Sequence, residues 1–557
     1  MAEVLNCLGL TATPIPPEGL AGRLGEISVL FLDDMNASPL IGELESWVRG
    51  GGTLVGCNTE GLDQIFGNSL SAVREQLGDE FSISGHFHFR ESGFTADIHS
   101  PLHPEAPLIT ASRLRLVNAS SSIEIGTDGE SSYITARPCG DGWAFYFGFN
   151  LAQTFWALQQ GRPIDRDYDG DGYWRTSDAS IIENNEHEIA YADELLFLLQ
   201  NIVGLQPLPL VHQMPPKDGR FPDFILYYAG DDEGESGVQV PAGDFMASRG
   251  LPYHINIMPK DRLFAITAEE EVQLKEDGTE LSLHLNFMDD FTHPGGFTED
   301  DVRLQAGLYA QRFVEAPICA NTHWWRWCGW SEPAIWMKKM GIKADNSFAH
   351  RRSPPLDPRN MIGFSFGTSF PHFIWTDFSR GNERIDFIEL PVVAYEVGYS
   401  FTSSFSKEEL EKGSVDVPQL KKALLLAKHY NMAMCMFYHP IYLARVPYCR
   451  KCIDELLSIL RDEGLEALHL GADEVVKWWT SRSKVRIDYV RFDGEALTFR
   501  SSCPSDGGFI AKISIGDREP LGLGVRSKVD NKFGNRWLLL LVPPGDNEIT
   551  VHLGPMA

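Results

Sequence analysis

The stretch FILYYAGDDEGE, residues Phe224–Glu235, decides how the centre of this chain is interpreted. Six apolar or strand-forming residues run into a glycine and then into three acids, Asp231, Asp232 and Glu233. Adjacent carboxylates repel one another and lose hydration at a sheltered strand end, so their charge has to be compensated. A metal ion, a proton shared between the acids, or plain solvent can compensate it. The stretch therefore predicts a buried strand that ends in an acidic turn.

Strand-like and helix-like patterns alternate around this stretch, from Phe224 to about Leu470. Further strand candidates are YHINIM, LSLHLNF, PICANTHWW and MAMCMFYHP, and helix candidates such as EDDVRLQAGLYAQRFV and VPQLKKALLLAKHY lie between them. About 250 residues of repeating β/α units is the size of a barrel. We therefore expect a distorted β/α barrel over residues 220–480.

Two flanking domains complete the predicted α/β fold. Within residues 1–210, the order of ISVLFLD, SPLIGELESWVRGGG and TLVGC is strand–helix–strand, which favours an open parallel sheet with a β-rich flank after it. Residues 485–557 show short alternating strands separated by Gly, Asp and Pro turns, which indicates a small β-sandwich. A chain of 557 residues is too long for one hydrophobic core, so several domains are expected.

Composition narrows the expected partners and location. The 77 acidic against 48 basic residues give a formal net charge of −29, which repels nucleic acid and anionic membranes. No apolar run reaches the ~18–20 residues of a membrane helix. The nine cysteines are odd in number and scattered, as in proteins of a reducing compartment, and no signal peptide is visible. We expect a cytoplasmic protein that binds neither nucleic acid nor membrane, and leave a homo-oligomer open.

Polar residues stand at four of the predicted barrel strand ends. In β/α barrels the working residues cluster at the carboxyl ends of the strands. The candidates at these ends are Asp231, Asp232, Glu233, His284, Asn286, His323, Arg326 and His439. Each of the four ends therefore carries a side chain able to bind a metal or to act as an acid or base.

At these positions the chain resembles the polysaccharide deacetylase (NodB-homology) family. YAGDDEGE stands for the Asp-Asp strand end of that family, LSLHLNF for its histidine motif, THWWRWCGW for its arginine-containing motif and MFYHP for its late histidine. The resemblance implies a metal-dependent carbohydrate hydrolase that removes an acyl group from an amino sugar or an acylated saccharide. It covers a little under half of the chain.

The resemblance also implies roles for the residues. Asp231 would be the base, His439 the acid, and Arg326 would hold Asp231 in its ionised form. The ligands of a divalent transition metal, zinc first, would be Asp232, His284 and His323. The family has a second histidine four residues after the first, whereas this chain has Met288 there; His323 is therefore taken as the third ligand, with Asn286 and Asp289 as alternatives. The expected substrate contacts are Glu233, Asn286, Trp324, Trp325, Trp327 and Trp330.

Two other functions fit the same residues. A metal-free glycoside hydrolase on a related barrel would use Asp231, Asp232 or Glu233 as acid or nucleophile. A catalytically inactive carbohydrate-binding protein is the other alternative, because the second family histidine is missing. A carbohydrate is the expected partner in each case.

An acidic run before the barrel predicts a second ion. In DRDYDGDG the residues Asp165, Asp167, Asp169 and Asp171 alternate with other residues, and glycines permit a sharp turn, as at the start of a calcium loop. The glutamate expected at position 12 is missing, and Thr176 stands there with Asp178 nearby. Calcium and a plain solvated loop are both left open.

The first domain resembles the class I glutamine amidotransferase-like fold. Cys57 follows a predicted strand in GGTLVGCNTEG, where that fold places a nucleophilic cysteine. The sequence lacks the Gly-x-Cys-x-Gly turn of the family, so the noncatalytic form of the domain is expected.

Overall fold

The structure is a computed structural model that describes residues 1–182, 188–288, 291, 293, 295–349, 362–399, 414–522 and 524–554. The chain divides into two compact units. The first comprises Met1–Gln159, Tyr191–Phe221 and Ser481–Ala557, and the second Gln160–Ala190 and Pro222–Thr480. The three predicted domains stay a prediction beside this division.

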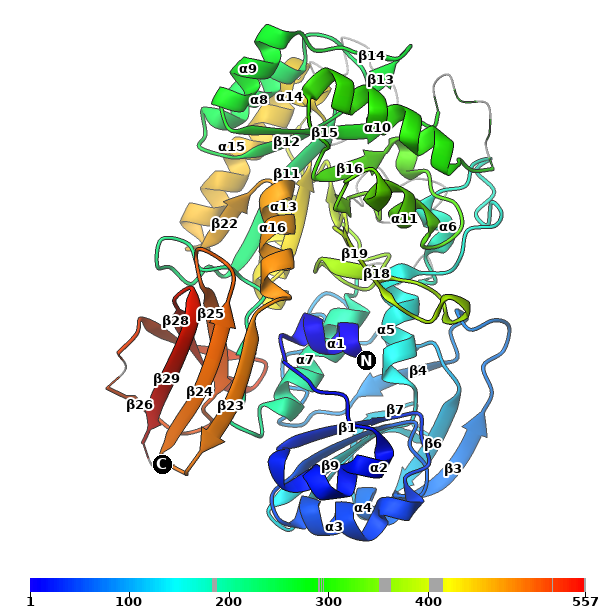
Figure 1. Ribbon diagram of the computed structural model, residues 1–557, viewed down its shortest axis with the longest axis vertical. Coiled ribbons are helices and arrows are strands. Elements are labelled where there is room, and N and C mark those ends of the chain that lie inside the picture. Colours follow the sequence, from blue (N-terminus) through cyan, green and yellow to red (C-terminus); the bar gives the residue numbers. More distant parts are fainter. Residues whose placement is uncertain are drawn as a thin grey trace. The chain divides into compact units, whose positions relative to one another are not determined.

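A ten-stranded sheet forms the centre of the second unit (Figure 1). Its order is β18-β19-β17-β16-β15-β12-β11-β21-β20, and β22 also pairs with β11. The strands are β11 (Phe224–Asp231), β12 (Tyr253–Ile257), β15 (Thr279–Leu285), β16 (Cys319–Thr322), β17 (Ala344–Asp345), β18 (His372–Trp375), β19 (Arg384–Glu389), β20 (Ala394–Tyr395), β21 (Ala433–Phe437) and β22 (Ala467–Leu470). All pairings are parallel except β18 with β19.

The two flanks of this sheet approach each other, so the sheet is curled like a barrel. β19 pairs with β17 on one flank, β20 pairs with β21 on the other, and only residues 390–393 separate β19 from β20. Because the paired strands run in the same direction, their carboxyl ends lie at one edge of the sheet. This barrel-like parallel core confirms the predicted α/β class.

Helices follow the strands and lie outside the curled sheet (Figure 1). They are α8 (Gln239–Ala247), α9 (Ala268–Glu276), α10 (Glu299–Phe313), α11 (Glu332–Lys339), α13 (Val417–Tyr430), α14 (Pro440–Arg445), α15 (Pro447–Asp462) and α16 (Ala472–Arg482). Capping boxes at Thr267 and Thr298 start α9 and α10, because each threonine accepts the N–H of an acid three residues on. Asn431, in a left-handed conformation, ends α13.

Two central strands each place a pair of buried polar residues on one face. β11, β12 and β21 are buried along their whole length, as expected of parallel strands covered on both faces. In β12, His254 and Asn256 alternate with apolar residues, and in β15 Ser282 and His284 do so. Since side chains alternate between the faces of a strand, each pair points to the same side. The sheet thus has buried polar groups that need partners.

The sheet of the first unit is parallel only in part. β1 (Val29–Asp33), β2 (Thr53–Cys57) and β9 (Gly142–Phe147) pair in parallel. The sheet continues with antiparallel pairings through β8 (Ser132–Cys139), β7 (Ile123–Thr127), β4 (Gly85–Phe89), β5 (Leu108–Thr110), β6 (Leu114–Ala119) and β3 (Asn68–Arg74). The predicted open parallel sheet is therefore a mixed sheet, and its β-rich flank is part of it. A tight turn at Gly140, with φ 63°, joins β8 to β9 and dictates the antiparallel pairing there.

Helices and two smaller sheets complete the first unit. The helices include α1 (Ala2–Leu8), α3 (Ile41–Arg49), α4 (Asp63–Phe66), α5 (Leu151–Gln160) and α7 (Tyr191–Val203). One four-stranded sheet consists of β10 (Pro209–Val211), β25 (Phe509–Ser514), β28 (Asn535–Val542) and β27 (Ser527–Lys532). The other consists of β23 (Arg486–Phe492), β24 (Ala496–Cys503), β29 (Gly545–Leu553) and β26 (Pro520–Leu521). The segment that follows α7 therefore supplies β10 to a sheet of the C-terminal residues.

Among the residues that the structure describes, no helix is both long enough and apolar enough to cross a membrane.

Candidate active site

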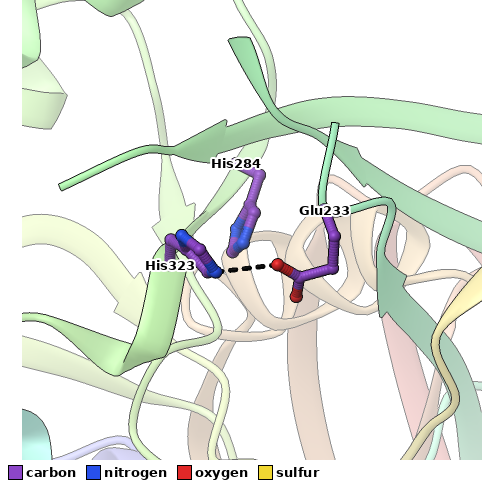
Figure 2. Close-up of side chains that lie close together, drawn as sticks. All are labelled: Glu233, His284 and His323. Atoms are coloured by element: carbon purple, nitrogen blue, oxygen red, sulfur yellow. Dashed lines mark ion pairs between the residues drawn. The ribbon is translucent and has the colours of Figure 1, made fainter. Parts of the chain in front are cut away.

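Three side chains from different strand ends meet at the carboxyl edge of the curled sheet (Figure 2). Glu233 follows β11, His284 lies in β15 and His323 follows β16. His323 Nε2 is 2.7 Å from Glu233 Oε2, and the rings of the two histidines are 5.1 Å apart. One ligand atom from each residue lies within 4.8 Å of the others, so small side-chain movements would bring all three onto one metal ion. We call these three residues the histidine cluster.

His284 is a buried ring of the histidine cluster, and its Nδ1 lies 3.6 Å from Asp231 Oδ1. Its side chain is fully buried, and neither ring nitrogen makes a hydrogen bond. Burial, and then the charge of His323, lowers the pKa of His284 to about 3, so the ring is neutral and able to bind a metal. A buried polar group without a partner costs about 1–3 kcal/mol. A cation between His284, His323 and Glu233 would remove this cost, so the donor set fits a divalent metal.

Glu233 supplies the negative charge of the histidine cluster. Its backbone is left-handed, with φ 56°, which costs about 1–2 kcal/mol for a residue with a Cβ atom. Burial by itself raises the pKa of Glu233, but hydrogen bonds from His323 and His439 hold it well below its usual value. The side chain is 31% exposed, so the carboxylate is ionised and reachable from solvent.

Asp231 lies beside the histidine cluster at the end of β11. Its Oδ1 accepts a hydrogen bond from Asn256 Nδ2 at 2.8 Å and lies 3.6 Å from His284 Nδ1. Its Oδ2 lies 3.9 Å from His439 Nε2. Burial raises the pKa of Asp231 to about 7, so this carboxyl group can gain or lose a proton near neutral pH.

His439 faces the same point from the far side of β11. It follows β21, its Nε2 lies 3.3 Å from Glu233 Oε1, and its Nδ1 lies 2.7 Å from Glu396 Oε1. The main-chain N–H of His439 donates to the same Glu396 oxygen at 2.9 Å. Burial by itself lowers the pKa of His439, but Tyr395, Glu233 and Glu396 raise it well above its usual value. His439 is therefore a protonated ring, oriented by a buried carboxylate.

Glu396 did not figure among the residues predicted from the sequence. It follows β20, a strand of two residues within the apolar run LPVVAYEVGY. The signal is weaker than at Asp231, where three acids follow the strand, because Glu396 stands alone inside an apolar run.

Asp232, which the resemblance predicts as a metal ligand, does not belong to the histidine cluster. Its Oδ1 accepts from the main-chain N–H groups of Gly234 and Met258, at 2.9 and 2.8 Å, and its Oδ2 accepts from Gln239 at 2.8 Å. It belongs to none of the potential metal-binding groups among the described residues. The turn after β11 needs the Asp232 oxygens for its own N–H groups, and Glu233, expected to contact substrate, faces the histidines instead.

Arg326 lies away from its predicted partner Asp231. Its buried guanidinium donates to the main-chain carbonyls of Trp174, Phe287 and His293, at 3.0, 2.9 and 2.8 Å. These hydrogen bonds connect the segment that carries Arg326 to the segments around Trp174 and around Phe287 and His293. Asp231 receives its hydrogen bond from Asn256 instead.

The side chain of Asn286 makes hydrogen bonds to main-chain groups of Pro259 and of the loop that follows β15. Its Nδ2 donates to the Pro259 carbonyl at 3.1 Å, and its Oδ1 accepts from the Met288 N–H at 3.2 Å. Its side chain therefore organises the loop. Asp289, the other alternative for the third metal ligand, lies outside the described residues.

The four tryptophans after β16 fall into two pairs. Trp327 and Trp330 are buried, and their indole N–H groups donate to main-chain carbonyls, so they are core residues. Trp324 is 49% exposed and packs against Tyr173 with ring centroids 5.7 Å apart. Trp325 packs at 5.3 Å against Tyr395, whose ring is 5.5 Å from His439. Trp324 and Trp325 are therefore the two that can offer ring faces beside the site.

The acidic run before the barrel forms a separate group, which we call the aspartate loop (residues 165–178). Asp167, Asp169 and Asp178 have carboxylate oxygens within 4.8 Å of one another. Two predicted ligands are engaged elsewhere, since Asp165 accepts from the Tyr168 hydroxyl and Asp171 pairs with Arg175. Asp178, seven residues after the last aspartate of the predicted run, completes the group because the loop folds back at its glycines.

Cys57 ends β2 in the first unit and is fully buried. Burial raises the pKa of its thiol well above the usual value. A protonated, enclosed thiol is a poor nucleophile, and the interpretation of this unit as amidotransferase-like stays a prediction.

No family model matches the sequence, and no curated protein matches it either. Among solved structures, the chain is similar to "T48 deacetylase with substrate", at 12% identity and a TM-score of 0.26 over 46% of this chain and 92% of that one. A family 4 carbohydrate esterase from Streptomyces lividans follows at 11% identity and a TM-score of 0.24, over 44% and 93%. A β-galactosidase from Bacillus circulans sp. alkalophilus is 13% identical with a TM-score of 0.22, and the match covers 26% of this chain and 23% of that protein. At such TM-scores none of these likenesses bears on function, which has to be argued from the site.

Proposed function

We propose that the chain is a metal-dependent hydrolase that removes an acyl group from a saccharide, with Glu233, His284 and His323 holding a divalent transition metal. The observation that carries the proposal is His284, a fully buried ring that faces Glu233 and His323 while neither of its nitrogens makes a hydrogen bond. Two imidazoles and one carboxylate are a donor set that suits zinc, as in many hydrolases.

The surrounding residues suit hydrolysis of an ester or amide. A divalent ion held by the histidine cluster would act as a Lewis acid toward the acyl carbonyl and lower the pKa of water. Asp231, beside His284, takes the proton of the attacking water. His439, kept protonated and oriented by Glu396, donates its proton to the leaving oxygen or nitrogen.

One exposed and one half-buried tryptophan support a saccharide as the substrate. The ring of Trp324 lies 6.4 Å from that of His323, and Trp325 connects through Tyr395 to His439. The flat faces of these two rings would stack against the apolar faces of sugar rings.

A glycoside hydrolase is the second candidate, and one observation favours it. Burial raises the pKa of Asp231 to about 7, while His323 and His439 hold that of Glu233 low against the effect of burial. One protonated and one ionised carboxyl group within 4.8 Å of each other resembles the acid and nucleophile of a retaining glycosidase.

One experiment separates the two candidates. Protein purified without chelators is analysed for metal content, and assayed for acetate release from acetylated saccharides and for cleavage of nitrophenyl glycosides. About one equivalent of a transition metal with acetate release is expected. Glycoside cleavage by metal-free protein would replace the first candidate with the second. Calcium bound to the aspartate loop would not bear on either, and it stays a prediction.

A further inference from the structure

A line of hydrogen-bonded polar side chains crosses the curled sheet and ends on Asp231. Glu280 Oε2 lies 3.0 Å from His254 Nδ1, and His254 Nε2 lies 3.1 Å from Asn256 Oδ1. Asn256 Nδ2 in turn lies 2.8 Å from Asp231 Oδ1. His254 and Asn256 have no solvent exposure, so these contacts are screened from water.

The register of the parallel strands builds this line. Asn256 of β12 pairs with Asp231 of β11, and His254 of β12 pairs with Glu280 of β15. His254 and Asn256 are two residues apart, so they point to the same face of β12. Their side chains bridge the start of β15 and the end of β11.

The hydrogen bonds assign a proton to each position. Asn256 donates its N–H to the Asp231 carboxyl group, so its carbonyl oxygen has to accept from His254 Nε2. His254 Nδ1 faces the Glu280 carboxylate and donates to it. Both ring nitrogens of His254 therefore carry protons. With Asp231 ionised, as its role as the base requires, the reversed amide would place its oxygen against a carboxylate oxygen, which is a repulsive contact.

The far end of the line is anchored at the amino terminus of α16. Glu280 accepts from the main-chain N–H groups of Asp473 and Glu474, at 2.9 and 3.2 Å, where the helix dipole also favours a negative charge. Burial by itself lowers the pKa of His254, but Glu280 and Asp473 raise it above its usual value. The charged ring is thus held against a carboxylate that the start of α16 keeps in place.

We propose that His254 and Asn256 are positioning residues for the base: His254 fixes the orientation of the Asn256 amide, and Asn256 holds the Asp231 carboxyl group in place for proton transfer. This inference rests on the proposed function, in which Asp231 is the base. The role is the one expected of Arg326, whose donors face main-chain carbonyls instead.

A double-mutant cycle tests the kinetic consequence. Asn256→Ala is expected to lower kcat for acetate release about 10–100-fold, with KM and metal content unchanged, because only the support of the base is lost. His254→Gln is expected to lower kcat less. The double variant should match Asn256→Ala, since His254 acts through Asn256. Losses that multiply in the double variant, or a change in KM alone, would overturn the inference.

Ser282→Ala is the matched control for this cycle. Ser282 is fully buried and pairs with Asn256 across β12 and β15, and its hydroxyl makes no hydrogen bond. Removing this hydroxyl changes the same layer of the sheet but none of the hydrogen bonds between Glu280 and Asp231, so kcat should not change. An equal loss of kcat in Ser282→Ala would show that the layer is merely sensitive to substitution, and would overturn the inference.

A measurement on the wild-type protein decides the geometry without any activity assay. In protein labelled with ¹⁵N-histidine and prepared without metal, both nitrogens of His254 should be protonated at pH 7. A neutral His254 ring would overturn the inference even if every variant failed to fold. If His254 is doubly protonated but the wild type releases no acyl group, the proposed function fails while the hydrogen-bonded line stands.

Discussion

The histidine cluster and the aspartate loop belong to the same unit and both gather acids, yet they differ in how their ligand atoms are satisfied. In the aspartate loop, both oxygens of Asp167 accept main-chain N–H groups, from Gly170 and Gly172. Asp178 likewise accepts from the N–H groups of Tyr168 and Arg175. In the histidine cluster, by contrast, the two buried nitrogens of His284 make no hydrogen bond at all.

This difference shows why acidic sequence runs are weak predictors of metal sites. A loop that satisfies its own carboxylates is stable without an ion, so an ion adds little to it. A buried ring whose nitrogens make no hydrogen bond destabilises the fold, and a bound ion would remove that cost. The following predictions test whether this distinction holds, from the largest expected effect to the smallest.

Removing a ligand of the histidine cluster should have the largest effect. His284→Ala and Glu233→Gln are expected to lose the bound transition metal and to lower kcat/KM for acetate release by more than about 10²-fold, because a lost ligand should cost more than a lost outer-shell partner. Elemental analysis and the acetate assay measure both. If both variants retained the metal at full stoichiometry, the histidine cluster would not be the metal site, and its missing hydrogen bonds would not distinguish it from the aspartate loop.

Removing the acid should impair catalysis and leave the metal in place. His439→Gln is expected to lower kcat about 10²–10⁴-fold through loss of proton donation, with metal content unchanged. Glu396→Gln, which keeps the side-chain size but weakens the contact to His439 Nδ1, should lose less. A metal-depleted His439→Gln protein would instead place His439 among the ligands, beside Asp231 and Glu233, with which it forms a second potential metal-binding group.

Asp232 should matter for stability and not for the metal. Asp232→Asn places an N–H₂ group where the carboxylate accepts from Gln239 or from the main chain, and should lower the free energy of unfolding by about 1–3 kcal/mol. Denaturant unfolding and elemental analysis of the same samples test this. Loss of the metal from a stably folded Asp232→Asn protein would restore its predicted role as a ligand.

The aspartate loop should show the smallest effect. Asp178→Asn removes one acceptor of a main-chain N–H group and should cost about 1 kcal/mol of stability, with kcat and transition-metal content unchanged. Added calcium should raise Tm slightly in the wild type and not in this variant, as binding to the folded state predicts. A fall in transition-metal content would show that metal binding at the histidine cluster depends on the aspartate loop, contrary to this prediction.

The strand ends were predictable because they follow from local rules. Asp231, His284 and His323 each stand at or near the end of an apolar run, and parallel strands place such ends at one edge. That Glu233 and not Asp232 faces the two histidines was not predictable. The main-chain N–H groups of Gly234 and Met258 donate to Asp232, and only the folded turn shows this. The local sequence does not show which carboxylate accepts these hydrogen bonds.

The sequence by itself determined the α/β core, the strand at Phe224–Asp231 and the edge at which polar side chains gather, since these rest on periodicity and strand direction. Only the tertiary structure decided the partners of these side chains. It placed Arg326 on main-chain carbonyls, Glu396 against His439, and Asn256 on Asp231. The physical reason is that strand register and turn hydrogen bonding join residues far apart in the chain, and a single sequence carries no direct signal of either.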